Sequence, residues 1–299
     1  MKEVRKYPSR LLFGLLLMTF GYTALTQDVV GIAVGYEYFP SAELVTPLPD
    51  APGLEIETSS KYISAAFPLS FQEGKITILN SLNYKKVSFS YENHPINSPV
   101  IDQAQYVDYS FFMIDSLNAR WKLAAMINPI IASDFESSLS KDDFIVGGIL
   151  GLIRTVNVKL DWGFGLAYMS DFGTPIPLPF IYLDWRPTPK VIVKGIIPSN
   201  LLVGRKMTNW FDLGMELAVD GNRFHGSPTK FGNARPFMRY SEGTLSALSR
   251  FHFAEWLHLN IYTGWGFFRN FEFYEGNDQV RSFDLKKVSY FSTQVVFGV

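Results

Sequence analysis

The chain alternates between apolar and polar or small residues, most regularly between Leu257 and Phe267. Odd positions there are large and apolar except Thr263, and even positions are polar, small or amphipathic. Because successive side chains of a β-strand point to opposite faces, this segment is predicted to be a strand with one apolar face and one polar face. Four further segments repeat the pattern. The five strong strand predictions are 28–39, 158–168, 211–219, 257–267 and 291–299.

Weaker strand patterns fill the intervals, and tight turns alternate with long loops between them. The weaker strands are 56–68, 74–86, 105–117, 121–131, 143–154, 180–186 and 236–252. Tight turns are expected at 72–74, 155–157, 186–189 and 253–255, and longer loops at 40–54, 92–104, 133–142, 170–178, 221–235 and 272–282. Short connections at one end and long ones at the other are typical of a transmembrane β-barrel.

The strand pattern therefore predicts an all-β fold, a transmembrane antiparallel up-and-down β-barrel of about 12 strands. The segment 190–205 resembles a short hairpin around Pro198. Both chain ends should lie at the same end of the barrel, so this hairpin adds either no strand or two. We expect 12 strands because each arm is short for a membrane span, and 14 is the alternative.

The alternating faces also fit an exported soluble β-protein with its apolar face turned inward. Three features favour the barrel. The polar faces are rich in Gly and Ala, which suits a narrow lumen, and the clearest ladders run about nine to eleven residues, the length of a tilted membrane strand. Tryptophans lie near ladder ends, where interfacial girdles form. They are Trp121, Trp185, Trp210 and Trp256.

The first 26 residues predict a cleaved signal peptide. A basic start precedes an apolar centre over 11–20, and Ala24 and Thr26 occupy positions −3 and −1 if cleavage precedes Gln27. The apolar run is shorter than the roughly 20 residues that a spanning helix needs. We expect a signal peptide over 1–26, an outer-membrane β-barrel domain over 27–299, and location in the cell outer membrane.

Composition and charge exclude some classes of binding partner and some kinds of chemistry. The formal net charge of −1 provides no basic surface for nucleic acid. The chain has no cysteine, which excludes disulfides, thiolate catalysis and cysteine metal sites. A closed barrel satisfies its backbone groups without disulfides. We expect outer-membrane lipid as the surroundings and no nucleic-acid partner.

The last predicted strand ends at the chain terminus and puts Phe297 and Val299 on one face. We expect the barrel-insertion machinery to recognise this strand. Its final residue is Val299, whereas outer-membrane proteins typically finish on an aromatic residue. The sequence leaves the oligomeric state open.

Two proline-containing segments support a family resemblance. They are Gly-Thr-Pro-Ile-Pro-Leu-Pro-Phe-Ile-Tyr at 173–182 and Ile-Ile-Pro-Ser at 196–199. With these segments, the signal peptide and the layout of strands and loops, the chain resembles a family of uncharacterised outer-membrane β-barrel proteins of Gram-negative bacteria, defined as a domain of unknown function. The resemblance covers most of the mature chain. It implies an outer-membrane location and brings no catalytic residues.

The polar faces of the ladders supply the candidate lumen-facing residues. Their charges are mixed, so they either pair across strands and fill the interior or segregate and select ions. The candidates are Glu37, Lys159, Asp161, Asp184, Arg186, Asp212, Glu216, His258, Asn260 and Tyr262.

No catalytic, cofactor-binding or metal site is predicted. A lipid hydrolase needs a serine and a histidine within hydrogen-bond reach, and the nearest local pair, His225 and Ser227, falls in a predicted loop. We expect a non-enzymatic, porin-like protein without cofactors that lets small solutes or apolar molecules pass. One alternative is a structural or surface-interaction barrel with a plugged lumen. A more distant one is a lipid-acting outer-membrane hydrolase.

Overall fold

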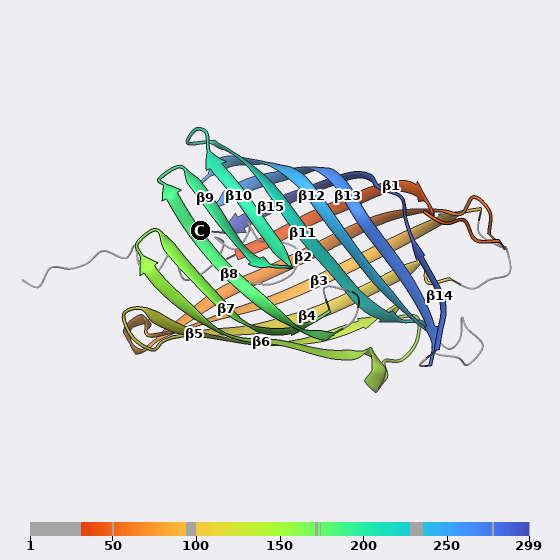
Figure 1. Ribbon diagram of the computed structural model, residues 1–299, viewed down its shortest axis with the longest axis horizontal. Coiled ribbons are helices and arrows are strands. Elements are labelled where there is room, and N and C mark those ends of the chain that lie inside the picture. The colour runs from red at the N-terminus through yellow and green to blue at the C-terminus, as the bar shows by residue number, and fades with distance from the viewer. Residues whose placement is uncertain are drawn as a thin grey trace, which may run out of the picture.

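The computed structural model describes residues 31–49, 51–93, 100–170, 173, 175–227, 236–276 and 278–298. These residues form one antiparallel sheet that closes on itself, because β12 pairs with β13 and β1 pairs with β15 (Figure 1). The strands are β1 Gly31–Glu43, β2 Glu55–Phe71, β3 Ile76–Glu92, β4 Gln103–Ser116, β5 Trp121–Ser133, β6 Phe144–Asn157, β7 Leu160–Met169, β8 Ile176–Thr188, β9 Val191–Ile197, β10 Asn200–Lys206, β11 Phe211–His225, β12 Phe237–Ala254, β13 Leu257–Glu275, β14 Asp278–Asp284 and β15 Val288–Gly298.

The closed wall has fourteen strand positions. Short β14 pairs with β13 over residues 270–275, and β15 pairs with β13 over residues 257–266. The two therefore occupy one position in succession. The expected count of twelve is wrong and the alternative of fourteen is right, because β9 and β10 both join the wall. Each has seven residues, so this hairpin covers only part of the barrel height.

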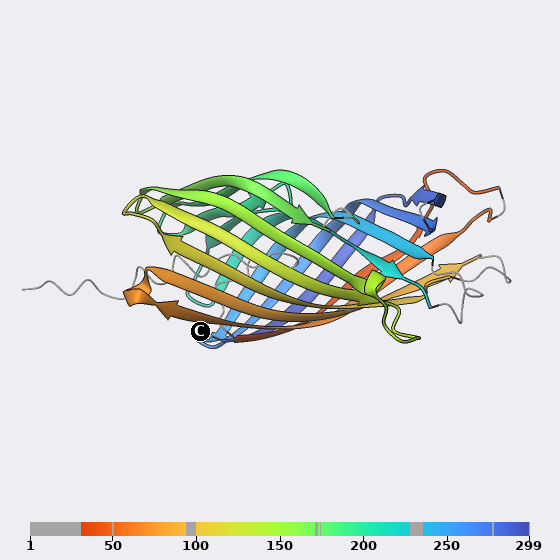
Figure 2. The same ribbon diagram turned by 90° about the horizontal axis from the view of Figure 1, so that it is seen from below.

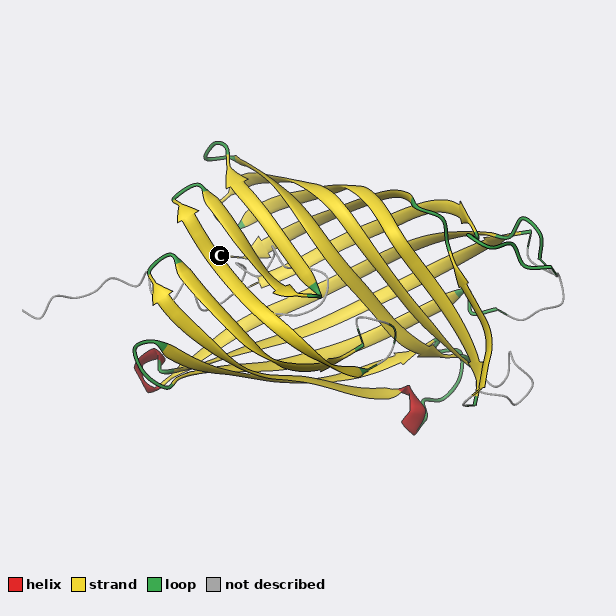
Figure 3. Cartoon of the chain, viewed as in Figure 1, coloured by secondary structure: helices red, strands yellow, loops and turns green. Residues whose placement is uncertain are grey.

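The two ends of the barrel differ in their connections. Gly31 pairs with Gly298, so the described wall begins and ends at the same end, which also carries the short turns. We refer to this as the turn end and to the opposite one as the loop end (Figure 3). Two 3-10 helices, η3 Gln72–Gly74 and η4 Lys141–Asp143, lie at the turn end and the loop end respectively.

Several strands extend beyond their predicted limits into segments expected to be loops. For example, β11 runs to His225 and β13 to Glu275. Figure 2 shows the strands tilted against the long axis on both sides of the wall. The predicted signal peptide and Val299 lie outside the described residues.

The alternating pattern places apolar side chains on the outside of the barrel. On β1, Ile32 and Val34 are 48% and 46% exposed, whereas Glu37 is 3% exposed. On β6 and β7, Leu150 and Leu166 are 61% and 63% exposed. The described wall thus has the outward apolar face of a membrane barrel and the opposite polarity to a soluble sandwich. Among the described residues, no helix has the length and apolar character to cross a membrane.

The predicted tryptophan girdle lies at the turn end. Trp121 begins β5, Trp210 and Trp256 immediately precede β11 and β13, and Trp185 is close to the last residue of β8. Trp210 stacks on Phe251 with ring centroids 6.3 Å apart. Aromatic side chains in this position are typical of a membrane–water interface.

Candidate functional site

An apolar layer fills the barrel interior at the loop end. Phe89 of β3 contacts Tyr240 of β12 with ring centroids 5.5 Å apart, although these strands are not neighbours in the wall. Tyr106 of β4 likewise reaches Phe224 of β11 across the interior, at 6.4 Å. The contacting buried residues of this loop-end apolar layer are Ala42, Leu44, Ala51, Leu54, Ile56, Val87, Phe89, Ile101, Ala104, Tyr106, Ile130, Ala132, Ile145, Phe224, Met238, Tyr240, Phe271, Phe283 and Leu285.

Buried charges cross the interior on the turn side of this layer. The Lys85 ammonium of β3 lies 2.5 Å from a Glu37 carboxylate oxygen of β1 and 3.6 Å from an Asp220 carboxylate oxygen of β11. Lys85 and Glu37 are only 3% and 4% exposed. Since β3 and β11 are far apart in the wall, this lysine connects opposite sides of the barrel.

Further polar contacts extend this charged region. Arg269 of β13 donates a hydrogen bond to the Thr58 hydroxyl of β2 and lies 4.7 Å from the Phe39 ring centroid. Glu216 interacts electrostatically with Arg250 and Lys194. Acidic and basic groups are therefore interspersed in this region of the interior.

Buried apolar side chains cluster on the inner surface of the wall between β3 and β9, beside buried polar groups that include Asp184 and Lys194. Phe112 of β4, Met126 of β5 and Phe180 of β8 contribute to this cluster, and all are buried. We define the inner apolar wall as Leu79, Phe112, Ile114, Ala124, Met126, Ile149, Ile153, Phe180, Tyr182 and Ile196. The Lys85–Asp220 bridge runs from β3 to β11, so it separates this surface from the polar side formed by β12, β13, β15 and β1.

Half-buried polar pairs lie toward the turn end. Lys122 of β5 donates a hydrogen bond of 2.8 Å to Asp161 of β7. The His252 Nε2 atom lies 2.8 Å from an Asp212 carboxylate oxygen, and the Nδ1 atoms of His252 and His258 are 2.9 Å apart. These side chains retain partial exposure, so the turn end of the interior is polar and the loop end is apolar.

The structure places the ten predicted lumen residues in three settings. Glu37, Asp184, Glu216, Asn260 and Tyr262 are buried, and Asp161, Arg186, Asp212 and His258 are half-buried near the turn end. Lys159 is exposed in the turn between β6 and β7. Asn260 donates to the Gln294 side-chain carbonyl at 2.9 Å and accepts from Arg250 Nε at 2.9 Å.

Sequence reasoning missed most of the residues that connect opposite walls. Lys85 lies in a weak part of the pattern, where Asn80 and Ser81 interrupt the alternation of β3. Arg269 follows a β-bulge, because the pairing with β12 passes from Gly266 to Phe268 and leaves Phe267 without an opposite residue. A bulge inverts the faces of the residues that follow. The one sequence signal of this bulge is Arg269 itself, a charged residue at an odd position, whereas the odd positions of 257–267 are mostly apolar.

Residues 225–227, which hold the nearest local pair of a histidine and a serine, have a structural role. No group of three or more metal-ligating side chains occurs among residues in the described ranges. The Ser227 amide donates to an Asp134 carboxylate oxygen at 2.5 Å, and the Asp134 amide donates to the His225 carbonyl at 3.1 Å. These contacts fasten the end of β11 to the end of β5.

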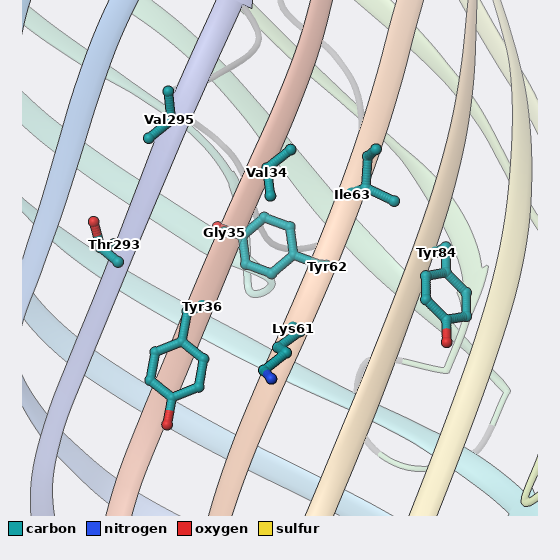
Figure 4. A pocket seen from close by; sticks show the side chains of 9 residues that line it. All are labelled: Val34, Gly35, Tyr36, Lys61, Tyr62, Ile63, Tyr84, Thr293 and Val295. Carbon is teal, nitrogen blue, oxygen red and sulfur yellow. The ribbon is translucent and has the colours of Figure 1, made fainter.

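A shallow apolar groove lies on the outer wall across β15, β1, β2 and β3 (Figure 4). Its outward side chains include Val34, Ile63 and Val295. The Tyr62 ring lies beside Gly35, where a Cβ atom would overlap it. The absence of a side chain at Gly35 thus lets the Tyr62 ring pack against the backbone of β1.

Gly35→Ala is expected to destabilise the barrel by about 1–3 kcal/mol, because the added methyl group displaces the buried Tyr62 ring. Urea unfolding of the refolded protein, followed by tryptophan fluorescence, measures the change. In a Tyr62→Ala background the same substitution should cost little, since the overlapping ring is gone. Equal costs in both backgrounds would show that the ring is not the obstacle.

Several known structures are remotely similar to this chain. The NanC porin shares 9% identity over 90% of this chain and 100% of its own, with a TM-score of 0.37. An outer membrane channel from Pseudomonas putida F1 shares 9% identity over 90% and 96% of the two chains, with a TM-score of 0.43. The Pseudomonas putida toluene transporter TodX shares 9% identity over 97% and 94%, with a TM-score of 0.34. At these TM-scores the likeness carries no argument about this chain, whose barrel rests on its own strand pairing.

No curated protein sequence matches the chain. One family, described as "Domain of unknown function (DUF6268)", matches residues 27–299. The match covers all the strands described above and agrees with the resemblance found in the sequence. The chain belongs to the DUF6268 family.

Proposed function

We propose that this protein is a non-enzymatic outer-membrane β-barrel that lets small apolar molecules pass without conducting ions. The observation that carries the proposal is the inner apolar wall between β3 and β9, inside a barrel whose loop end is filled by apolar side chains. An apolar surface solvates an apolar molecule and offers an ion no replacement for its hydration shell.

The outer-membrane location is supported by the outward surface of the wall. A closed barrel pairs its backbone groups strand to strand, which is a requirement for crossing hydrocarbon. Outward residues such as Leu150, Leu166 and Met215 are more than half exposed and apolar. The predicted signal peptide is consistent with export to this membrane.

The interior charges support exclusion of ions. Lys85 is neutralised by Glu37 and Asp220, and Arg250 and Lys194 face Glu216. Paired charges attract a mobile ion less than a ring of one sign does. Beyond them, the loop-end apolar layer consists mainly of aliphatic and aromatic side chains, which do not replace the hydration shell of an ion.

Entry of N-phenyl-1-naphthylamine into Gram-negative cells tests the proposal. This small apolar dye fluoresces when it reaches lipid, and an intact lipopolysaccharide-bearing membrane slows its entry. Cells that display the protein should take up the dye several-fold faster than cells that do not. Uptake of a charged, membrane-impermeant dye of similar size should stay unchanged.

Variants of the inner apolar wall provide the matched control. Met126→Gln places a polar amide on this surface and should lower dye entry about two- to thirtyfold, since apolar transfer of an amide costs about 0.5–2 kcal/mol. Met126→Leu keeps the surface apolar at similar volume and should leave entry unchanged. Equal dye entry with and without the protein would contradict the proposal.

The second candidate is a structural or surface-interaction barrel with a plugged lumen. The loop-end apolar layer favours it, because side chains of β3, β4, β11, β12 and β13 meet across the interior there. This candidate predicts no dye entry beyond that of control cells. Dye entry that responds to Met126→Gln excludes it.

A further inference from the structure

Two lysines lie directly opposite each other on the outward face of β2 and β3. Lys61 pairs in register with Lys86, and both alternate with buried neighbours, so their side chains point away from the interior. We call them the lysine pair. Directly opposite side chains have Cβ atoms about 4.5–5.5 Å apart, and like charges there repel each other. An anion held by both ammonium groups would offset this repulsion.

The charges of the lysine pair have no ion-pair partner within the part of the chain that the structure describes. The nearest outward acid on β2 is Glu57, whose carboxylate accepts a hydrogen bond of 2.8 Å from the Tyr38 hydroxyl. Beside Lys86 in the register lies Gln105 of β4, whose side-chain carbonyl accepts from the Tyr84 hydroxyl at 2.7 Å. These neighbours therefore leave the positive charge of the pair available to an external anion.

Another pair of opposed cations near the loop end has acceptors within the protein. Arg223 of β11 lies directly opposite Arg239 of β12. The Arg239 guanidinium lies 3.4 Å from a Glu272 carboxylate oxygen. The Arg223 guanidinium donates a hydrogen bond of 3.4 Å to the Asp142 carbonyl. The lysine pair differs from these arginines because its charges have no such partners on the neighbouring strands.

The lysine pair lies at the loop-end edge of the apolar outer surface. The outward side chains of β2 within 63–71 are apolar, and Lys61 is the next outward residue toward the loop end. On β3, Leu82 and Tyr84 precede Lys86 in the same direction. Long loops mark the extracellular end of a bacterial membrane barrel, so this edge belongs to the outer leaflet. The ammonium groups therefore lie at the depth of the lipid headgroups.

The outer apolar groove adjoins the lysine pair on its membrane side. Its lining includes Val34, Ile63 and Val295, and it extends to Lys61 and Tyr36. In the register Val34 lies opposite Ile63, and Tyr36 lies opposite Lys61 one outward position closer to the loop end. Figure 4 shows the Lys61 ammonium and the Tyr36 hydroxyl on this same side of the groove. An apolar groove with a cation at its headgroup end is complementary to an acyl chain attached to an anionic headgroup.

We infer that the lysine pair and this groove bind lipid A, the phosphorylated and acylated anchor of lipopolysaccharide in the outer leaflet. A phosphate accepts hydrogen bonds from Lys61 and Lys86, and an acyl chain lies along Val34 and Ile63. A free phosphate would use the lysines alone, and an uncharged lipid would use the groove alone. The inference rests on the outer-membrane location proposed above and is independent of the passage of apolar molecules.

Native mass spectrometry of the refolded protein in detergent micelles with added lipids tests this site. The protein should bind bisphosphorylated lipid A more tightly than dephosphorylated lipid A or phosphatidylglycerol. Lys61→Gln with Lys86→Gln should weaken lipid A binding about two- to thirtyfold, the range for a pair of exposed ion pairs. Lys61→Arg with Lys86→Arg should retain it. The control is Lys159→Gln with Lys190→Gln, which removes the same charge from exposed turns at the turn end.

Filling the groove tests the acyl-chain part of the site separately. Val34→Trp places a bulky ring in the groove and should weaken lipid A binding several-fold. Ile32→Trp, at the preceding outward position of β1 and outside the groove lining, should leave binding unchanged.

Three results would overturn the lipid A site. They are equal affinity for lipid A and phosphatidylglycerol, equal lipid A binding by the glutamine variant and its control, and displacement of lipid A by inorganic phosphate, which would indicate a site for the anion alone. None of these results alters the dye-entry test of the proposed function. Absence of dye entry with intact lipid A binding would overturn passage and leave this site in place.

Discussion

Leu150→Arg is expected to destabilise the inserted barrel by about 2–4 kcal/mol, because it places a charge on the outward face near the middle of β6. The matched substitution is Val158→Arg, in the turn that follows β6. Val158 is 97% exposed and Leu150 is 61% exposed, so in water both arginines would be solvated at little cost. In a membrane the cost depends on depth and falls to about 0–1 kcal/mol near the interface.

Urea unfolding of both variants in lipid vesicles measures this difference. A large loss for Leu150→Arg and a small one for Val158→Arg would support the assignment of the outward face to lipid. Similar small losses at both sites would contradict the membrane assignment.

Lys85→Met should cost about 3–5 kcal/mol, since removal of the ammonium leaves the Glu37 and Asp220 carboxylates in the interior without their shared cation. Urea unfolding of the refolded protein gives the loss directly. Adding Glu37→Gln and Asp220→Asn should recover much of it, because the remaining groups are then neutral. No recovery in the triple variant would show that the lysine contributes by its packing alone.

The exposed pair of Lys286 and Glu43 provides the control for Lys85. Its ammonium and carboxylate also lie 2.5 Å apart, but both side chains are more than half exposed. Lys286→Met should leave the unfolding midpoint unchanged, because solvated ion pairs contribute little to stability. A comparison of Lys85→Met with Lys286→Met thus separates the effect of burial on stability from the effect of the ion-pair distance.

The alternation of outward residues predicted the fold class well, because a membrane barrel requires an apolar side chain at every second position of a spanning segment. Ladders such as 257–267 and 211–219 lie within observed strands. The strand count failed at β9 and β10, whose seven-residue arms do not have the length of a span. Their place in the wall depends on pairing with β8 and β11, which no local pattern reveals.

The interior was harder to predict than the wall. Period-two alternation predicted Glu37, Glu216 and Asn260 as polar positions on the inward face, but it gave no information on partners across the barrel. The contacts of Lys85 with Asp220 and of Phe89 with Tyr240 join strands far apart in sequence. They follow from the closure and shape of the barrel, which depend on all the strand registers together.

The measurement that tests the central claim most directly is the ion conductance of the refolded protein in a planar bilayer. Insertion is verified separately by protection of the strands from protease. The loop-end apolar layer and the paired interior charges predict that inserted barrels show no conductance steps across a range of salt concentrations. Steady ohmic steps from the inserted barrel would contradict an interior that excludes ions, and would indicate a water-filled pore.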